Sequence, residues 1–371
     1  MDASGRLTIS NVKSICGREK LAVIFCRVID HFGDAGFCWR LSLALVEQGI
    51  GQVILVVDRP QIVRKLHGEG APQHVTVLDW HRALDEWSAG GIPPSYRSAL
   101  VVEAFACSVP DAFANGLSPR ARWITLDHLA TEPWADQAHA MPSPHPRIQS
   151  AAAAKRRWMI PGFSARTGGL LHGSWRHLGG KERDQWRARL AGQKIGHTTF
   201  LVLAFGYSDA QWPRLEASMR RVLPRGFVDA VVWRPEGLDY TQEEFDQILQ
   251  ACDFNFVRGE DSFIRAHWAA AGRWQVPFVW QPYRQAQQGH ARKLAEWTDQ
   301  ILDGAALAVL SDLHWAWNQL ASDGVSNPPD FDLAWDAFCR RYATVRQALS
   351  QKCEGLALQP SLEERLMALI S

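Results

Sequence analysis

The chain has 371 residues, of which 47% are hydrophobic and 21% are charged. This balance excludes an intrinsically disordered chain, and the length suits two domains better than one. The 40 Lys and Arg residues are balanced by 39 Asp and Glu residues, which argues against a general nucleic-acid binder, because such proteins carry a basic excess.

Cysteine usage and hydropathy indicate the compartment. The seven cysteines are scattered without a C-x-x-C spacing, and an odd number in a chain with a large core is typical of reduced thiols. No apolar run approaches the ~20 residues that cross a bilayer, and residues 1–20 lack the apolar centre of a signal peptide. We therefore expect an N-terminal extension over 1–20 and a cytoplasmic protein without membrane contact.

In the first half, short apolar runs alternate with segments of helical spacing. Strands are predicted over residues 21–28, 53–58, 75–78, 100–102 and 123–126. Helices are predicted between them, over residues 37–48, 60–67 and 81–88. Repeated strand and helix predicts a parallel sheet that helices cover on both faces.

Residues 131–180 interrupt this alternation with many prolines and glycines, which predicts loops and a domain hinge. After the hinge, strands are predicted over residues 200–205, 228–233, 254–257 and 277–280. Helices are predicted over residues 211–222, 242–252, 287–302, 331–349 and 361–370. The sequence thus predicts two doubly wound domains, 21–180 and 181–371, with a cleft between two facing sheets.

The first candidate site is Cys26–Arg40, CRVIDHFGDAGFCWR, between the first predicted strand and the first helix. Gly33 and Gly36 permit a positive φ or a close ligand, and Asp30 and Asp34 stand four apart. Two carboxylates in one place can divide substrate orientation and proton acceptance. The structural alternative is that Asp34 caps the helix and Asp30 ends the strand. Because the glycines do not form G-x-G-x-x-G, a nicotinamide enzyme is disfavoured.

The second candidate site is Val257–Trp268, VRGEDSFIRAHW, where another strand ends and a helix begins. The junction carries Arg258, Gly259, Glu260, Asp261 and Ser262. A helix start beside a glycine and an arginine suits a diphosphate, and a glutamate there can accept hydrogen bonds from sugar hydroxyls. The alternative is an ordinary helix cap by Asp261 or Ser262.

Other motifs exclude several enzyme classes. The chain has no zinc spacing, no G-x-x-x-x-G-K-[ST] and no G-x-S-x-G, which disfavours zinc enzymes, P-loop kinases and common hydrolases. Asp330 and Asp332 form a D-x-D that we expect to cap the following helix rather than to hold a metal. Tyr207 and Tyr240 follow predicted strands and either contact a base or pack in the interior.

Four motifs together resemble the EarP family, protein-arginine rhamnosyltransferases that act on translation elongation factor P. They lie at Cys26–Leu41, Val102–Cys107, Pro161–Leu171 and Asn255–Trp268, and the likeness runs from about residue 21 to 297. The resemblance implies a GT-B fold of two Rossmann-like domains. It also implies an inverting transfer of L-rhamnose from dTDP-β-L-rhamnose to an arginine of elongation factor P, without a metal or other cofactor. The N-terminal domain would receive the acceptor protein and the C-terminal domain the nucleotide sugar.

The resemblance also assigns roles to single residues. Asp34 matches the general base, Asp30 the carboxylate that helps to hold the acceptor guanidinium, and Glu260 an essential glutamate. The expected donor-site residues are Tyr207, Tyr240, Gln242, Arg258, Glu260, Asp261 and Ser262. Backbone N–H groups at the Gly33 turn would add positive field for the leaving diphosphate.

The chain departs from the family pattern at His31, over residues 127–129, around Tyr240, over Ala269–Gln275 and over Pro282–Gln285. Both carboxylate motifs are intact, so these departures bear on details of the donor pocket. Two other functions stay open at this point. One is a GT-B enzyme with a small-molecule or polysaccharide acceptor, and the other is a nucleotide-sugar-binding protein without catalysis.

Overall fold

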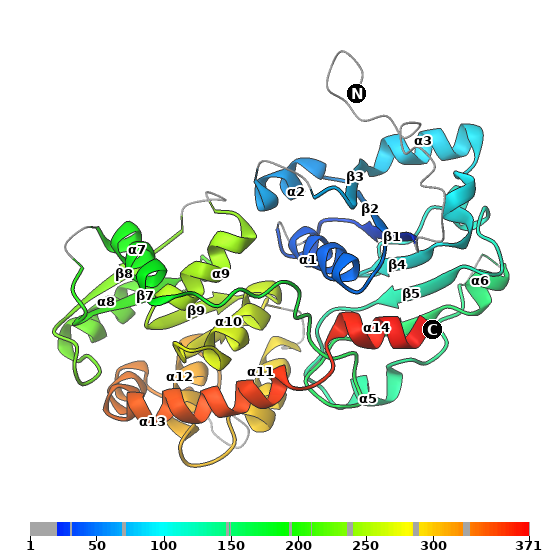
Figure 1. Ribbon diagram of the computed structural model, residues 1–371. Helices are drawn as coiled ribbons and strands as arrows, with labels where there is room; N and C mark the ends of the chain where they lie inside the picture. Colours follow the sequence, from blue (N-terminus) through cyan, green and yellow to red (C-terminus); the bar gives the residue numbers. More distant parts are fainter. Residues whose placement is uncertain are drawn as a thin grey trace. The chain divides into compact units, whose positions relative to one another are not determined.

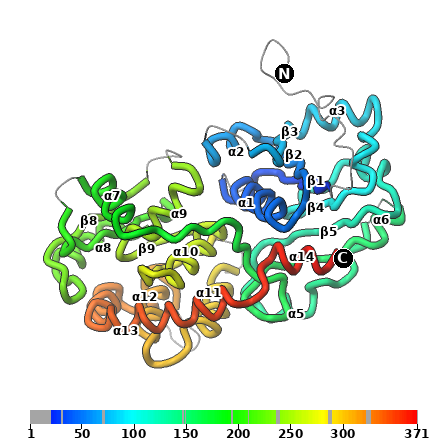
Figure 2. The backbone as a smooth tube through the Cα atoms, viewed as in Figure 1, coloured from blue at the N-terminus to red at the C-terminus, as the bar shows by residue number. Residues whose placement is uncertain are grey.

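The computed structural model describes residues 21–29, 32–68, 72–145, 148, 150–192, 195–208, 210–235, 240–284, 289–321 and 327–370. These residues form two compact units, whose backbones are drawn in Figures 1 and 2. Unit 1 holds the described residues of Met1–Leu129, Trp134–Ser174 and Ser361–Ser371. Unit 2 holds those of Ala130–Pro133 and Trp175–Pro360.

Unit 1 is built on a 6-stranded parallel sheet with the strand order β3-β2-β1-β4-β5-β6. Its strands are β1 (Leu21–Cys26), β2 (Gln52–Val57), β3 (Val75–Asp79), β4 (Leu100–Ala104), β5 (Arg122–Leu126) and β6 (Arg157–Met159). Its helices are α1 (Gly33–Glu47), α2 (Pro60–His67), α3 (Trp80–Gly90), η2 (Pro94–Ser98), α4 (Asp111–Ala114), α5 (Trp134–Ala138), α6 (Ala151–Ala154) and α14 (Leu362–Ile370). Helix α1 packs on one face of this sheet and contacts both α2 and α14.

An aromatic cluster fills the other face of the unit 1 sheet. The Phe25 ring lies 5.6 Å from that of Trp80 and 4.8 Å from that of Phe113, both edge to face. Trp87 of α3 also joins this cluster, so several of the chain's tryptophans serve as core residues. Strand β1 is buried on both faces, which explains its unbroken apolar sequence.

Unit 2 is built on a 4-stranded parallel sheet with the order β10-β9-β7-β8. Its strands are β7 (Thr199–Ala204), β8 (Asp229–Trp233), β9 (Phe254–Arg258) and β10 (Phe278–Gln281). Its helices are α7 (Gly180–Ala191), α8 (Trp212–Arg221), α9 (Gln242–Ala251), α10 (Asp261–Ala271), α11 (Gly289–Ile301), α12 (Ala308–Asn318) and α13 (Phe331–Ala357). The long helix α13 packs against α10 and α12 (Figure 1).

The structure confirms the predicted parallel α/β architecture and differs from the sequence-based expectation at the domain boundary. The predicted second domain ran from residue 181 to the end, whereas α14 belongs to unit 1. Backbone contacts explain this assignment, since Leu362 N donates to Leu170 O at 2.8 Å. The Glu363 carboxylate also accepts from Gly173 N at 3.0 Å. Within the hinge region, residues 157–159 form the edge strand β6 instead of a loop.

The D-x-D segment caps a helix, as predicted. Asp330 is the N-cap of α13 and its carboxylate accepts from Leu333 N at 3.0 Å. Asp332 pairs with Arg214 at 3.2 Å and with Arg221 at 3.3 Å. These contacts account for both carboxylates as parts of the α8–α13 interface.

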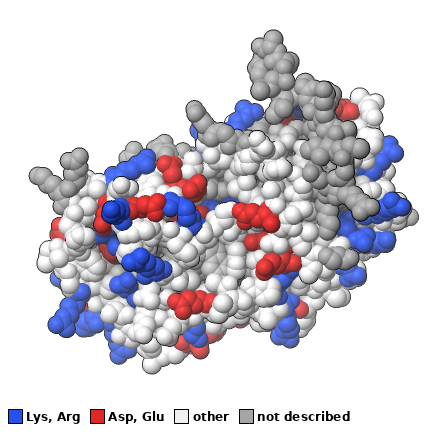
Figure 3. All heavy atoms as spheres, viewed as in Figure 1, with Lys and Arg blue, Asp and Glu red and all other residues white. Residues whose placement is uncertain are grey.

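The described part of the chain shows neither a grouping of three or more potential metal ligands nor a helix of the length and apolarity needed to span a membrane. Its cysteines are buried and are not joined in disulfides within these residues. On the face drawn in Figure 3, basic and acidic side chains are interspersed, in line with the balanced composition.

Two histidines are buried in the core of unit 2. His267 Nε2 accepts a hydrogen bond from Trp297 Nε1 at 3.2 Å, so its Nδ1 carries the proton and donates to Phe263 O at 2.8 Å. Burial lowers the pKa of His267 to about 4 and that of the neighbouring His314 to about 3. Both rings are therefore neutral in the folded protein near pH 7.

We expect the protein to lose stability as the pH falls from about 6.5 towards 4. In the unfolded chain both histidines take up protons near pH 6.5, whereas the folded chain binds them only at lower pH. The free energy of unfolding should fall by up to about 1.4 kcal/mol per pH unit for each histidine. Urea unfolding at pH 7 and pH 5 tests this, with His267→Gln as the comparison. An equal pH dependence in that variant would contradict the assignment.

Candidate functional site

Each of the two candidate segments follows a strand at the point where the strand order of its own sheet reverses. In unit 1, β2 and β3 follow β1 towards one edge of the sheet, and β5 and β6 follow β4 towards the other edge. In unit 2 the corresponding pair is β7 and β9. Open α/β sheets bind ligands beyond the carboxyl ends of such strands. The segments that follow β1, β4, β7 and β9 are therefore the candidate site residues.

Asp34 lies in the first turn of α1, directly beyond β1. Asp34 is only 5% exposed, and its Oδ2 accepts from Ile29 N at 2.8 Å. Asp58, which follows β2, accepts from Val28 N at 3.0 Å, so two carboxylates hold the same segment. The N-cap of α1 is Phe32, which makes no side-chain cap. The alternative of Asp34 as the helix cap is thus wrong.

The glycines of this segment do not adopt the positive φ that the sequence permitted. Gly33 begins α1 and Gly36 lies in its first turn, with Gly36 N bonded to Phe32 O at 2.8 Å. Both glycines leave the start of the helix without side chains, and this suits close approach of a ligand. Asp30 and His31 lie outside the described residues.

The thiol of Cys26, at the end of β1, is not a nucleophile near neutral pH. Its hydrogen bond with Cys38 raises its pKa well above the usual range, and burial raises it further. The nearby Asp34 and Asp58 carboxylates act in the same direction. A protonated thiol leaves the carboxylates as the groups in this segment that can accept a proton.

The turn after β4 is strained and packs against α1. Phe105, Ala106 and Ser108 have φ values of 55°, 52° and 57°, in the left-handed region that costs about 1 kcal/mol or more per non-glycine residue. The Phe105 ring contacts Phe37 of α1 at 5.6 Å and stacks on His128 at 4.5 Å. Such strain is common at functional sites. No sequence pattern predicts this pairing of Phe105 with His128.

In unit 2, Arg258 lies at the end of β9 against the segment that follows β7. Its guanidinium lies 4.7 Å from the Phe205 ring centroid and 4.8 Å from that of Tyr207, and it donates to Gly206 O at 3.4 Å. The Ser262 hydroxyl accepts from Arg258 N at 3.2 Å and donates to Arg258 O. The fold thus brings together three predicted donor residues, namely Tyr207, Arg258 and Ser262.

The turn between β9 and α10 depends on a glycine. Gly259 has a φ of 64°, and its carbonyl accepts from Trp280 Nε1 at 2.7 Å. The N-cap of α10 is Glu260 without a side-chain cap, so the alternative that Asp261 or Ser262 caps this helix is wrong. The start of α10 therefore presents backbone N–H groups at the carboxyl end of β9.

Further contacts connect the predicted donor residues with two residues that the sequence did not single out. Gln242 Nε2 donates to Asp261 Oδ2 at 3.3 Å. Lys293 Nζ of α11 lies 3.7 Å from Glu260 Oε1. Gln281, at the end of β10, accepts from Tyr207 N through Oε1 at 2.9 Å. The position of Gln281 after a predicted strand was a usable signal, whereas Lys293 carried none.

Tyr240 packs against side chains of β8 and α7. Its ring lies 5.2 Å from Trp233 and 6.4 Å from Trp186, and the Arg189 guanidinium lies 5.5 Å from it. Among the described residues, Tyr240 makes no ring contact with Tyr207. The predicted donor residue Gly33 belongs to the other unit.

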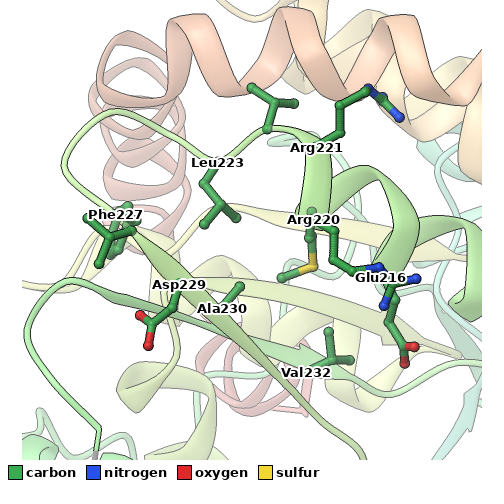
Figure 4. A pocket seen from close by; sticks show the side chains of 11 residues that line it. Glu216, Arg220, Arg221, Leu223, Phe227, Asp229, Ala230 and Val232 are labelled. Atoms are coloured by element: carbon green, nitrogen blue, oxygen red, sulfur yellow. The ribbon is translucent and has the colours of Figure 1, made fainter.

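A hollow of about 640 Å³ in unit 2 is not part of the candidate site. It lies between α8 and β8, with Leu223, Phe227 and Val232 on its walls (Figure 4). Asp229, the first residue of β8, also lines it. Because parallel strands start at the same edge, this hollow faces the amino ends of the strands, opposite to Arg258.

From the nucleotide-sugar site that the sequence resemblance implies, we expect Gly206→Ala to weaken nucleotide binding by about tenfold. A methyl group at Gly206 would lie 2.7 Å from the Trp212 ring and 2.9 Å from Gln281 Oε1, which holds Tyr207 N. Displacing Gln281 removes that hydrogen bond and shifts Tyr207. Calorimetric titration with dTDP measures the loss. Gly355→Ala is the control, because a methyl group there meets nothing within 4 Å. Equal affinities would contradict the role of this turn.

Comparison with known proteins identifies the family. The model of the family described as Elongation-Factor P (EF-P) rhamnosyltransferase EarP matches residues 22–225 and 237–371. The protein-arginine rhamnosyltransferase of Pseudomonas aeruginosa is 31% identical over 392 residues, covering 93% of this chain and 97% of that protein. The protein of the same name from Pseudomonas putida is 30% identical over 389 residues, covering 93% and 97%.

Solved structures agree on the fold. The structure described for EarP-mediated arginine glycosylation of translation elongation factor EF-P matches with a TM-score of 0.55 at 20% identity, covering 94% of this chain and 98% of that chain. Arabidopsis thaliana UGT89C1 complexed with UDP matches with a TM-score of 0.50 at 13% identity, covering 95% and 99%. These likenesses confirm the predicted GT-B fold. The chain therefore belongs to the EarP family of protein-arginine rhamnosyltransferases.

Proposed function

We propose that this enzyme transfers L-rhamnose from dTDP-β-L-rhamnose to an arginine of translation elongation factor P, with inversion, in the cytoplasm. The observation that carries the proposal is the position of the two shared motifs, since each follows a strand at the reversal point of its sheet. The names of the relatives and of the matched EarP structure support the acceptor.

The donor would bind at the segment Arg258–Ser262 in unit 2. Arg258 and the backbone N–H groups at the start of α10 supply positive field for a diphosphate. Tyr207, Tyr240 and Gln242 are proposed to contact the thymine, with Asp261 orienting Gln242 through their hydrogen bond. Glu260 would accept hydrogen bonds from the sugar hydroxyls while Lys293 balances its charge.

The acceptor is a difficult nucleophile. An arginine guanidinium has a pKa above about 12, so removing its proton at pH 7 as a separate step costs roughly 7 kcal/mol or more. We propose that Asp30 and Asp34 hold the guanidinium and direct one nitrogen at the anomeric carbon. The bond from Asp34 to Ile29 N fixes the orientation of that carboxylate. A carboxylate has about four acceptor positions, so one backbone bond is compatible with proton transfer.

In the proposed transfer the guanidinium loses its proton while the new bond forms, so no separate deprotonation step is needed. The C–N bond forms as the bond between the anomeric carbon and the diphosphate oxygen breaks, and dTDP leaves with that electron pair. The attacking nitrogen becomes more acidic as the bond forms, and its proton passes to Asp34. Positive field from Arg258 stabilises the charge on the leaving diphosphate, with the N–H groups at Gly33 as a proposed second source.

Mass spectrometry tests the function directly. The enzyme is incubated with elongation factor P and dTDP-β-L-rhamnose, and the acceptor is then digested and sequenced by tandem spectra. We expect one deoxyhexose on one arginine. Transfer only to small molecules or polysaccharides would favour the alternative acceptor class. Donor binding without turnover on any acceptor would favour a binding protein.

A further inference from the structure

A cluster of basic residues lies at the amino ends of the unit 1 strands. This basic patch consists of Arg97, Arg120, Arg122, Lys155 and Arg157, all exposed. Arg122 and Arg157 are the first residues of β5 and β6, and Arg97 shortly precedes β4. In Figure 3, blue side chains gather at the end of unit 1 where α6 lies.

Four members of the basic patch bond to backbone groups of neighbouring segments. Arg97 O accepts from Ser118 N at 2.7 Å, and Lys155 Nζ donates to Pro119 O at 3.5 Å. The side chain of Arg122 donates to Ile370 O at 3.3 Å. Arg157 likewise donates to Ala140 O at 2.9 Å. Arg122, Lys155 and Arg157 also line a common hollow, so these three side chains form one surface.

The described residues provide no carboxylate partner for any member of the basic patch. Several other exposed arginines among the described residues, such as Arg82, Arg176 and Arg214, do pair with Glu or Asp. The side chains of Arg122, Lys155 and Arg157 donate to carbonyl oxygens, and no carboxylate of the described residues neutralises their charge. Like charges gathered in this way raise the free energy of the surface unless an anion binds.

Three members of the basic patch line a hollow of about 410 Å³ that also has aliphatic walls. Ile124, Pro142, Ala154, Leu369 and Ile370 contribute the apolar walls. The rim carries Arg122, Lys155 and Arg157, and the lining contains no acidic residue. An apolar hollow with a cationic rim is complementary to an apolar side chain flanked by carboxylates.

We propose that the basic patch binds an acidic segment of a partner protein, which inserts an aliphatic side chain into the hollow. Strands β4, β5 and β6 begin at this edge, whereas Asp34 and the strained turn after β4 lie beyond the carboxyl ends. The surface is thus at the opposite edge of the sheet from the proposed acceptor residues. It serves a protein contact separate from the transfer of the sugar.

The lining favours a peptide over a nucleic acid. Single-stranded nucleic acids bind through exposed aromatic rings that stack on bases, and the one aromatic residue of the lining, Trp123, is 1% exposed. Aliphatic walls make no hydrogen bond or ion pair with a phosphate, but they can bury a leucine-sized side chain away from water. The balanced charge of the whole chain also lacks the general basic excess of a nucleic-acid binder.

Fluorescence anisotropy with defined probes tests the proposal. The peptide probe is fluorescein-labelled and consists of Glu-Glu-Leu repeated four times, and the competing probe is an oligouridine of the same length. The patch variant carries Arg122→Glu, Lys155→Glu and Arg157→Glu. The control variant carries Lys181→Glu, Arg220→Glu and Arg340→Glu, three exposed basic residues of unit 2 with the same total charge change. Thermal unfolding shows that each variant is folded.

We expect saturable binding of the peptide that weakens as salt is added, by at least about tenfold in the patch variant and less than twofold in the control. A peptide in which serine replaces leucine should bind less tightly. No binding of the peptide to the wild-type chain, equal loss in both variants, or tighter binding of the oligouridine would each overturn the proposal.

Discussion

We expect Asp34→Asn to lower the rate of rhamnose transfer by about 10³-fold or more, while the affinity for dTDP changes less than twofold. The amide keeps the shape of the side chain and can still accept from Ile29 N through its oxygen, but it cannot take a proton from the attacking nitrogen. Because donor binding is proposed for unit 2, calorimetry with dTDP should give the wild-type affinity. Single-turnover transfer measures the chemical step.

Asp58→Asn is the matched control for this variant. Asp58 makes the same kind of bond to the same segment, through Val28 N at 3.0 Å, but has no assigned part in proton transfer. We expect the rate of rhamnose transfer in Asp58→Asn to fall by less than tenfold. If Asp58→Asn and Asp34→Asn lose activity equally, the role of Asp34 is to hold the segment after β1. Full activity of Asp34→Asn would refute its assignment as the base.

Arg258→Ala is expected to lower kcat/KM by 10²- to 10³-fold, roughly the effect of removing one oriented donor from a developing negative charge. The affinity for dTDP should fall by about tenfold or more, because the guanidinium is a charge-assisted donor to phosphate. Arg258→Lys keeps the charge but not the planar fork, so an intermediate loss is expected. Steady-state kinetics with varied donor, together with dTDP titration, separates the two effects.

Arg234→Ala is the control for Arg258. Its guanidinium also lies over an aromatic ring, 5.6 Å from Trp212, but it is exposed and pairs with Glu216. We expect nearly wild-type kinetics. Wild-type donor affinity in Arg258→Ala would show that the diphosphate binds elsewhere.

The sheet architecture could be predicted from sequence because the central strands of each sheet are buried on both faces. Runs such as Val53–Val57 and Phe200–Ala204 are wholly apolar, and this pattern has few other interpretations. Strand β6 was missed because it lies at the sheet edge, where Arg157 faces solvent, and because prolines and glycines surround it. Helix α7 was missed because it begins at Gly180, which is typical of loops.

Residues of the candidate site could be predicted from sequence where they stand close together along the chain. Arg258, Glu260, Asp261 and Ser262 are consecutive or nearly so, and a strand end next to a helix start marks them. Lys293 and Gln281 reach the same place from α11 and β10, so only the folded chain shows them. The contacts of Tyr240 with Trp186 and Trp233 also depend on tertiary packing. Spacing along the sequence carries no signal for such contacts.

A crystal structure of the enzyme with dTDP and an arginine-containing peptide of the acceptor protein tests the account most directly. We predict the diphosphate against Arg258 and the first N–H groups of α10, and the acceptor guanidinium within hydrogen-bond distance of the Asp34 carboxylate. A nucleotide bound elsewhere, for example in the hollow beside β8, or a guanidinium held away from Asp34, would contradict it.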